Sequence, residues 1–196
     1  MEKTIYIVRH CSAVGQAPHA ELTAEGILQA AQLAEYFDGI EVNRVITSPF
    51  SRARQTGWPL AERKKLYVEI DSRLGERMLS SVDFTDWMIK LEDTFYDFHL
   101  KYEGGESSSE AMSRVCDVVD GLGDGSQTVL VTHGNLMALL LRRYDKQFGF
   151  EQWRTLTNPD VYAVRIKDGD SEVERVWDPI QKTGRLESSL FDVRSI

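Results

Sequence analysis

The sequence predicts an α/β protein: a three-layer α/β/α sandwich on a mostly parallel, mixed sheet, with a C-terminal antiparallel hairpin. Short apolar runs rich in β-branched residues, at 5–8 and 128–131, alternate with segments of helical periodicity. The run 5–8 is nearly continuously apolar, as expected of a strand that is covered on both faces. The hairpin is predicted by two strand-like segments, 161–166 and 172–177, on either side of Asp168-Gly169, a strong signal for a tight turn.

The length of 196 residues suits one domain, which we expect over residues 1–178 with a helical insertion at about 78–106. The remaining segment, 179–196, is polar and weakly patterned, and no regular structure is assigned to it. The sequence contains no internal repeat or low-complexity tract. The chain is therefore treated as one folding unit with a C-terminal tail.

The composition is that of an ordinary soluble globular protein, with 42% hydrophobic and 28% charged residues. A net charge of −8 argues against broad binding to nucleic acid or to anionic membranes, so an anionic substrate would need a local basic cluster. The two cysteines, Cys11 and Cys116, are far apart and lack metal-ligand spacing. No run resembles a signal peptide or a membrane span. These features predict a cytoplasmic protein without disulfides, metal or cofactor.

The first half of the chain is predicted to contain three strands and two helices. A helix starting at Thr23 as N-cap and ending at Gly39 places one apolar stripe on the sheet, made of Ile27, Ala30, Ala31, Ala34 and Phe37. After a strand at 43–47, Ser48 is predicted to cap a second helix with Pro49 in its first position. Arg52 and Arg54 lie in its first turns, about 200° apart, so they cannot face the same site. A third strand is predicted at 66–70.

The second half is predicted to begin with a loop at 71–79 and a long amphipathic helix over 84–102. Its apolar face is interpreted as packing surface, with a ligand-contacting surface as the alternative, and consists of Phe84, Trp87, Met88, Leu91, Phe95, Phe98 and Tyr102. Ser107 and Glu110 have the spacing of a capping box at the start of the next helix. The strand at 128–131 is followed by a buried helix, which is apolar nearly all round over 136–141.

Two of the predicted strands end in a histidine, in Val8-Arg9-His10 and in Val131-Thr132-His133. Either histidine alone is more often structural than catalytic. Neighbouring parallel strands would, however, bring both imidazoles to one edge of the sheet, where open α/β sheets bind ligands. The strand at 43–47 ends just before the segment that carries Arg52, so Arg52 is expected at the same edge of the sheet, called the rim below. Arg offers paired donors for a phosphate, and a neutral imidazole is a competent nucleophile, so the pattern predicts a phosphate site.

Six short motifs occur in order and at suitable spacing over residues 4–140. They are Arg9-His10, the run 22–26 (LTAEG), the run 47–56 (TSPFSRARQT), the run 74–77 (LGER), Gly105-Glu106-Ser107 and Thr132-His133-Gly134. Together they resemble the histidine phosphatase (phosphoglycerate mutase-like) superfamily. The resemblance implies an α/β/α sandwich whose first-strand histidine becomes phosphorylated. It places the chain in the phosphatase branch of that superfamily.

By position, the resemblance assigns His10 as the nucleophile and Arg9 as its phosphate-binding neighbour. Arg52 matches the second phosphate clamp, His133 the second histidine, and Glu76 the acid that protonates the leaving group. Arg54 matches no catalytic position. If Glu76 is not the acid, Glu106 and Asp83 are the next carboxylates to consider.

Other residues are expected to contact the substrate. They are Gln16, near the place of a phosphate-binding asparagine in mutases, together with Arg77, Gly134 and Asn135. The sequence departs from the family at Cys11, where glycine is usual. Cys11 is interpreted as a tolerated small side chain, with an oxidisable site as the alternative.

The implied activity is hydrolysis of a phosphomonoester, either one small phosphorylated metabolite or a broad set, by a metal-independent acid-type phosphatase. One alternative is phosphoryl transfer of the phosphoglycerate mutase type. Mutases have a Tyr-Gly-x-Leu-like continuation after the acid and a longer insertion, whereas here Glu76 is followed by the run 77–81 (RMLSS). The other alternative is a non-catalytic phosphate-recognition module, which would not need Glu76. If the chain is a phosphatase, the helix over 84–102 is expected to set selectivity, with Phe84, Trp87 and Arg77 as candidates. The sequence leaves the substrate, and the choice between monomer and homodimer, open.

Overall fold

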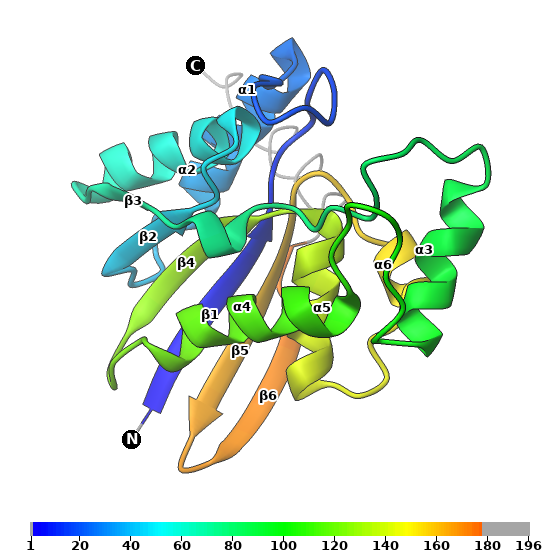
Figure 1. Cartoon of the computed structure of the whole chain (residues 1–196). Coiled ribbons are helices and arrows are strands. Elements are labelled where there is room, and N and C mark those ends of the chain that lie inside the picture. Colours follow the sequence, from blue (N-terminus) through cyan, green and yellow to red (C-terminus); the bar gives the residue numbers. More distant parts are fainter. Residues whose placement is uncertain (1, 178–196) are drawn as a thin grey trace, which may run out of the picture.

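A computed structural model describes residues 2–177, so the predicted tail at 179–196 lies outside the described residues. The chain forms a six-stranded mixed sheet in the order β3-β2-β4-β1-β5-β6 (Figure 1). The strands are β1 (Glu2–Arg9), β2 (Arg44–Thr47), β3 (Val68–Ile70), β4 (Gln127–Thr132), β5 (Asp160–Lys167) and β6 (Asp170–Arg175). The first four in this order are parallel, and β5 and β6 are antiparallel to their neighbours. The predicted fold class is confirmed.

Helices cover both faces of the sheet and create two separate cores. They are α1 (Ala24–Tyr36), α2 (Ser51–Lys64), α3 (Trp87–Tyr96), α4 (Ser108–Asp120), α5 (Gly134–Tyr144) and α6 (Phe150–Arg154), with a 3-10 turn η1 (Ser72–Leu74). Alternate residues of β1 face opposite layers: Tyr6 and Val8 pack with α1 and α2, whereas Ile5 and Ile7 pack with α3, α4, α5 and α6. This burial on both faces explains the unbroken apolar pattern of the central strands.

Several local predictions are confirmed in atomic detail. Thr23 caps α1, since its hydroxyl accepts a hydrogen bond from the Gly26 amide at 3.0 Å. The capping box of Ser107 and Glu110 is present at the start of α4. In the β5–β6 turn, Asp168 and Gly169 have φ angles of 50° and 95°, as a two-residue hairpin with positive φ requires.

The predicted buried face of α1 is confirmed for Ala30, Ala34 and Phe37, which are buried. It was wrong for two residues: Ile27 is 61% exposed and Ala31 is also exposed, whereas Gly26 and Leu33 are buried. Gly26 packs directly against the backbone of Ser12, where a Cβ would collide with the carbonyl oxygen. This close approach sets the rotation of the helix. α1 also ends at Tyr36, earlier than the predicted end at Gly39.

Helix α2 begins at Ser51, so the prediction that Ser48 and Pro49 start it was wrong. The Ser48 hydroxyl instead accepts a hydrogen bond from the Phe50 amide at 3.2 Å and bonds to His133. The strand that precedes α2 and the strand that follows it are also shorter than predicted, by one and two residues at their N-terminal ends.

The predicted long helix over 84–102 is shortened to α3, which covers only Trp87–Tyr96. Asp97 ends it with an extended backbone, and its carboxylate accepts a hydrogen bond from the His99 amide at 2.9 Å, which turns the chain. The buried residues of α3 are Leu91, Thr94 and Phe95. Trp87, predicted to be packing surface, is 48% exposed.

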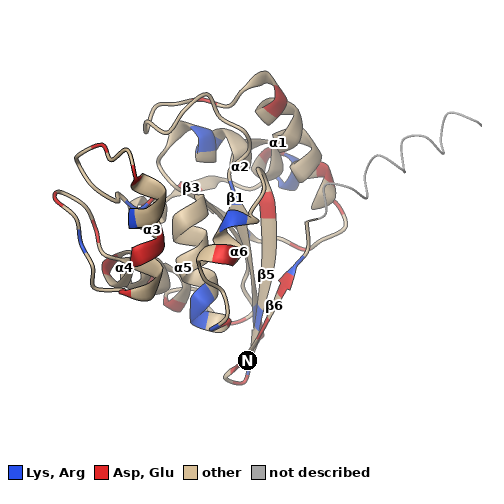
Figure 2. Cartoon of the chain, turned by 90° about the vertical axis from the view of Figure 1, so that its right-hand side faces the viewer, with Lys and Arg blue, Asp and Glu red and all other residues tan. Residues whose placement is uncertain are grey.

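Charged side chains are spread over the elements that Figure 2 presents, and they do not gather into one basic or acidic field. The edge strand β6 carries Asp170, Glu172 and Glu174, which protect an exposed edge from pairing with another chain. Within residues 2–177, no helix has the length and apolar character needed to cross a membrane.

Candidate active site

The ends of β1 and β4 bring two histidines together. The strands are parallel neighbours with Arg9 opposite Thr132, and the His10 amide donates to the Thr132 carbonyl at 3.0 Å. The rings of His10 and His133 then meet edge to face, with centroids 5.1 Å apart. The rim expected from the two strand ends is therefore present.

His10 is held as a neutral imidazole in one tautomer. Its Nδ1 lies 2.7 Å from the carbonyl oxygen of Cys11. Since a carbonyl can only accept, Nδ1 carries the proton and Nε2 keeps its lone pair. Burial lowers the pKa of His10 to about 4, and the positive charges of Arg52 and Arg9 act in the same direction. At neutral pH the nitrogen that a nucleophile needs is therefore Nε2.

Arg52 reaches that nitrogen from the first turn of α2. Its Nε donates to His10 Nε2 at 3.1 Å, and its Nη1 donates to the carbonyls of Gln16 and Ala17 at 3.1 and 2.9 Å. The guanidinium also lies over the ring of Phe50, 5.0 Å from its centroid. Arg52 is 1% exposed, whereas Arg54 is exposed, which confirms that the two cannot share a site.

His133 is completely buried and is oriented by Ser48. Its Nε2 lies 2.8 Å from the Ser48 hydroxyl, and the ring of Phe50 packs against it at 4.8 Å. Its Nδ1 is buried without a hydrogen-bond partner. Burial holds the pKa of His133 well below its usual value, with His10 and Arg52 as further causes. Ser48 is a site residue that the sequence interpretation missed, because the Ser-Pro pair was assigned to helix capping.

Arg9 joins the histidine cluster to the start of α5. Its Nη1 donates to the Leu156 carbonyl at 2.8 Å, and its Nε is buried without a partner. Gly134, the first residue of α5, lets the guanidinium lie against the helix, since a Cβ there would be 3.1 Å from Arg9 Nε. The Arg side chain and the helix N-terminus together form an environment suited to an anion.

Glu76 sits at the same helix end. Its Oε1 accepts from the amides of Arg77 and Leu136 at 2.9 and 3.1 Å, and its Oε2 accepts from the Asn135 amide at 3.2 Å. The three backbone donors fix the direction of the carboxylate, which lines the same pocket as Arg9. Glu76 is thus the carboxylate placed in one pocket with Arg9.

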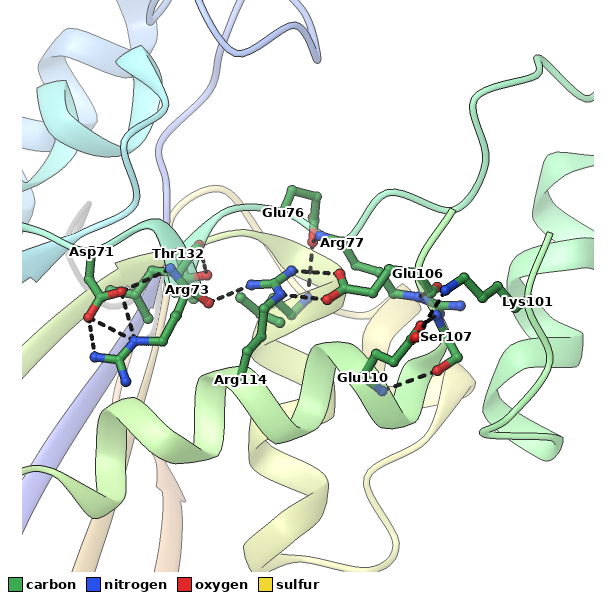
Figure 3. Close-up of polar contacts among 12 residues, drawn as sticks. Asp71, Arg73, Glu76, Arg77, Lys101, Glu106, Ser107, Glu110, Arg114 and Thr132 are labelled. Atoms are coloured by element: carbon green, nitrogen blue, oxygen red, sulfur yellow. Dashed lines mark hydrogen bonds and ion pairs between the residues drawn. The ribbon is translucent and has the colours of Figure 1, made fainter. Parts of the chain in front are cut away.

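The loop that carries Glu76 is anchored on both sides, as Figure 3 shows. Thr132 donates its hydroxyl proton to the Leu74 carbonyl at 2.8 Å. Arg73 pairs with Asp71, and its carbonyl accepts a hydrogen bond from Arg114. These contacts tie the loop to β4 and α4, so the position of Glu76 depends on residues from three elements.

The two carboxylates considered as substitutes are placed differently. Glu106 makes a bidentate pair with Arg114, with N–O distances of 2.7 and 2.8 Å (Figure 3). Asp83 is exposed. Neither lines the pocket that contains Glu76.

That pocket has a volume of about 370 Å³ and opens beside the histidine cluster. Its lining consists of Arg9, Gln16, Glu76, Arg77, Leu79, Trp87, Leu91, Gly134, Asn135 and Trp153. All four residues expected to contact the substrate are in this set. The side-chain oxygen and nitrogen of Asn135 are buried without a partner. Gln16 is exposed, and its backbone carbonyl is what contacts Arg52.

Cys11 is a buried structural residue. It has no exposed surface, burial raises the pKa of its thiol to about 12, and its amide donates to the Thr56 hydroxyl at 3.0 Å. A thiol in this state is a poor nucleophile and a poor redox site. Thr56 belonged to the motif that identified Arg52, but its contact was not foreseen. Asn158, whose amide donates to the His10 carbonyl at 2.7 Å, gave no signal in the sequence.

Residues 2–177 contain no cluster of three or more His, Cys, Asp or Glu side chains arranged to hold a metal ion. The rim instead brings together two imidazoles, two guanidinium groups and one carboxylate, contributed by His10, His133, Arg9, Arg52 and Glu76. Such a set has the groups that chemistry requires for binding a phosphoryl group, transferring it to a nitrogen and moving one proton.

Comparison with known proteins identifies the family. The sequence model of the histidine phosphatase superfamily (branch 1) matches residues 5–179. The chain therefore belongs to the histidine phosphatase superfamily.

Among curated relatives, the uncharacterized protein Rv0525 of Mycobacterium tuberculosis is 35% identical over 82 residues, which cover 38% of this chain and 41% of that protein. A probable phosphoglycerate mutase, GpmB of Salmonella choleraesuis, is 27% identical over 157 residues, which cover 70% and 72%. A mycobacterial glucosyl-3-phosphoglycerate phosphatase has the same fold, with a TM-score of 0.70 at 23% identity, covering 89% of this chain and 98% of that one. The chain spans less than half of the first relative.

Proposed function

We propose that this protein hydrolyses phosphomonoesters of small molecules by transferring the phosphoryl group to His10 Nε2 and then to water. The observation that carries the proposal is the state of His10. Its imidazole is neutral, its proton is on Nδ1, and its Nε2 faces Arg52 at the end of β1. This is the arrangement that a nitrogen nucleophile for phosphorus requires.

In the absence of a ligand, Arg52 Nε donates to the attacking nitrogen itself. An incoming phosphate oxygen is a stronger acceptor for that N–H, because the hydrogen bond is then assisted by two opposite charges. Arg52 therefore moves its hydrogen bond to the substrate and frees the lone pair of His10. Binding and activation of the nucleophile are the same event in this scheme.

Two buried polar atoms near His10 lack protein partners, Arg9 Nε and His133 Nδ1. Buried donors and acceptors are normally satisfied, so their lack of a partner supports a polar ligand between them. An Arg donor placed there stabilises the charge that spreads over the equatorial oxygens of the transferring group. Arg9, Arg52 and His133 thus act by positioning and charge.

Glu76 moves the proton. In the first step the P–O bond breaks, the P–N bond to His10 forms, and the leaving alkoxide takes a proton from Glu76. A phosphomonoester has a second pKa of ~6, so its monoanion brings the proton that Glu76 must hold. In the second step Glu76 takes a proton from water, which attacks phosphorus and breaks the P–N bond.

A phosphoglycerate mutase activity is the second candidate, and the match to a probable mutase favours it. One observation favours hydrolysis. The pocket lining includes four bulky apolar side chains, Leu79, Trp87, Leu91 and Trp153, which suit a glycerate poorly. A purely phosphate-binding module would not need Glu76 in the pocket.

The test is phosphate release from 4-nitrophenyl phosphate by the purified protein, with and without EDTA, alongside a mutase assay with 3-phosphoglycerate. We expect release of phosphate at a rate that EDTA leaves unchanged, and no isomerisation of 3-phosphoglycerate. Activity lost on chelation and restored by a divalent ion would contradict the metal-independent mechanism. Isomerisation faster than hydrolysis would establish the mutase instead.

A further inference from the structure

The pocket has two chemically different halves. The half next to His10 is made by Arg9, Glu76 and the N-terminus of α5. The outer half contains four apolar side chains, Leu79, Trp87, Leu91 and Trp153, and the polar Gln16 and Arg77 complete the lining of the pocket. A phosphomonoester bound with its phosphate at His10 would place its alcohol portion in the outer half, so these four residues face the leaving group.

The two tryptophans come from different elements that pack together. Trp87 begins α3, and Trp153 belongs to α6, which lies beside α3 in Figure 1. Trp153 stacks on Phe150 with ring centroids 5.4 Å apart and an interplanar angle of 21°. Phe150 in turn contacts Phe95 of α3 at 5.9 Å. The indole of Trp153 is therefore held in place by an aromatic chain.

Arg77 keeps the wall formed by Leu79, Trp87, Leu91 and Trp153 in place before a ligand binds. Its Nη1 donates to the hydroxyls of Thr94 on α3 and Ser108 on α4, at 2.8 and 3.0 Å. Its Nε donates to the Glu106 carbonyl at 2.8 Å. The buried guanidinium thus connects α3 to α4 and fixes the helix that carries Trp87. A wall fixed before binding loses little conformational entropy when a ligand arrives.

Trp87 is the exposed member of the wall, at 48% of its surface. A large aromatic side chain that borders a pocket and remains half exposed is stabilised when a ligand covers it. The polar groups at the other end fix the phosphate, so the part of the ligand that covers the indole is its alcohol portion. Flat aromatic surfaces are best covered by another ring, in offset or edge-to-face contact.

We propose that this site selects phosphomonoesters whose leaving alcohol carries an aromatic ring, which packs against Trp87 and Trp153. The inference rests on the proposed function, since it takes the phosphate of the ligand to lie at His10. It names the substrate class: a ring attached to a phosphorylated alcohol, in contrast to small acyclic acids such as glycerate.

The experiment compares 2-phenylethyl phosphate with propyl phosphate. Both release primary alcohols of similar basicity, so the demand on Glu76 is the same and the ratio of their kcat/KM values reports contact with the ring. We expect 2-phenylethyl phosphate to be preferred by about 10- to 100-fold, the effect of covering one ring in an apolar pocket. A ratio near one, or a preference for 3-phosphoglycerate, would overturn the proposal.

Two variants test whether the preference for 2-phenylethyl phosphate over propyl phosphate comes from the wall. Trp87→Leu changes a half-exposed side chain and is expected to reduce the ratio by about 5-fold or more, and Trp153→Leu likewise. The matched control is Trp58→Leu, since Trp58 is 62% exposed on α2 and lies outside this pocket. An unchanged ratio in both wall variants, with their thermal unfolding intact, would contradict the assignment.

Binding measured without turnover separates this proposal from the proposed function. The His10→Ala variant, which lacks the proposed nucleophile, is titrated with 2-phenylethyl phosphate and propyl phosphate, and intrinsic tryptophan fluorescence gives the two dissociation constants. Phosphate release is measured separately with the wild type. Tighter binding of the ring compound that Trp87→Leu removes, with no phosphate released, would refute hydrolysis and keep the ring site. Phosphate release from both compounds with equal binding would refute the ring site and keep hydrolysis.

Discussion

The phosphate side and the alcohol side of the pocket are built in opposite ways. On the phosphate side, His10 and His133 stand at the ends of adjacent parallel strands, and both are buried. On the alcohol side, Trp87 and Trp153 stand on two short helices that hold each other through aromatic contacts. In the proposed function, the sheet thus fixes the atoms that must be placed accurately for chemistry, while helices at its margin carry the surface that we propose determines selectivity.

Removing a cation from the phosphate side is expected to have the largest effect on turnover. We expect Arg52→Ala to lower the turnover of any phosphomonoester by about 10³-fold or more, since it removes a charge that stabilises the transition state. Arg54→Ala is the control two residues away, on the exposed face of α2, and should keep nearly full activity. Steady-state kinetics with 4-nitrophenyl phosphate test this prediction. Equal losses of turnover in the two variants would contradict the role assigned to Arg52.

Glu76 stands between the two halves, and its effect should depend on the leaving group. Glu76→Gln keeps the shape but has no proton to give. An alkoxide needs that proton and a nitrophenolate does not, so alkyl phosphates should slow by about 10²- to 10⁴-fold more than 4-nitrophenyl phosphate. Equal losses on both substrates would argue against Glu76 as the acid, and attention would turn to Glu106 and Asp83.

The buried imidazoles should make folding stability depend on pH. The pKa of His10 is about 4 in the folded protein and near 6.5 in the unfolded chain. Between these values the unfolded state binds the extra proton, so stability is lost as pH falls from about 6.5 to about 4, by roughly 3 kcal/mol at most for this residue. Urea unfolding at pH 7 and pH 4.5 should show a smaller loss for His10→Asn than for the wild type, and an identical loss would contradict the buried, neutral state.

A substitution at Ser48 tests whether turnover depends on the hydrogen bond that orients His133. Its hydroxyl bonds to His133 Nε2, so Ser48→Ala leaves that ring without its partner. We expect a loss of about 10-fold in turnover, since removing one neutral hydrogen bond is worth about 1 kcal/mol and its absence loosens the ring. The variant should unfold at nearly the temperature of the wild type. A loss as large as that of Arg52→Ala would mean that Ser48 itself contacts the phosphoryl group.

The sheet and the rim were predictable because their signals are local. Strands β1 and β4 are buried on both faces, so their sequences are largely apolar. Neighbouring parallel strands end at the same edge of the sheet. The pairing of His10 with His133 therefore follows from the order and pattern of the residues alone. The contacts of Cys11 and Ser48 do not, because they join side chains or amides of different elements that no periodic pattern brings together.

The alcohol side was less predictable for a physical reason. The helical period over 84–102 continues beyond the end of α3, but the side chain of Asp97 turns the chain and breaks the helix. Trp87 was therefore expected inside and is half exposed. Trp153 gave no signal in the sequence, since its place depends on the packing of α6 against α3. Part of the face of α1 was misplaced for a similar reason, because contact of Gly26 with the loop sets the rotation of the helix.

The central claim is that His10 Nε2 accepts the phosphoryl group. The direct measurement is rapid quenching of the protein with 4-nitrophenyl phosphate, followed by mass spectrometry of the peptide that contains His10 under alkaline conditions. We expect an added phosphoryl group on His10 that is lost in acid, that accumulates in Glu76→Gln, and that is absent from His10→Ala. A phosphoryl group on another residue, or the same amount of modified peptide from His10→Ala, would contradict the account.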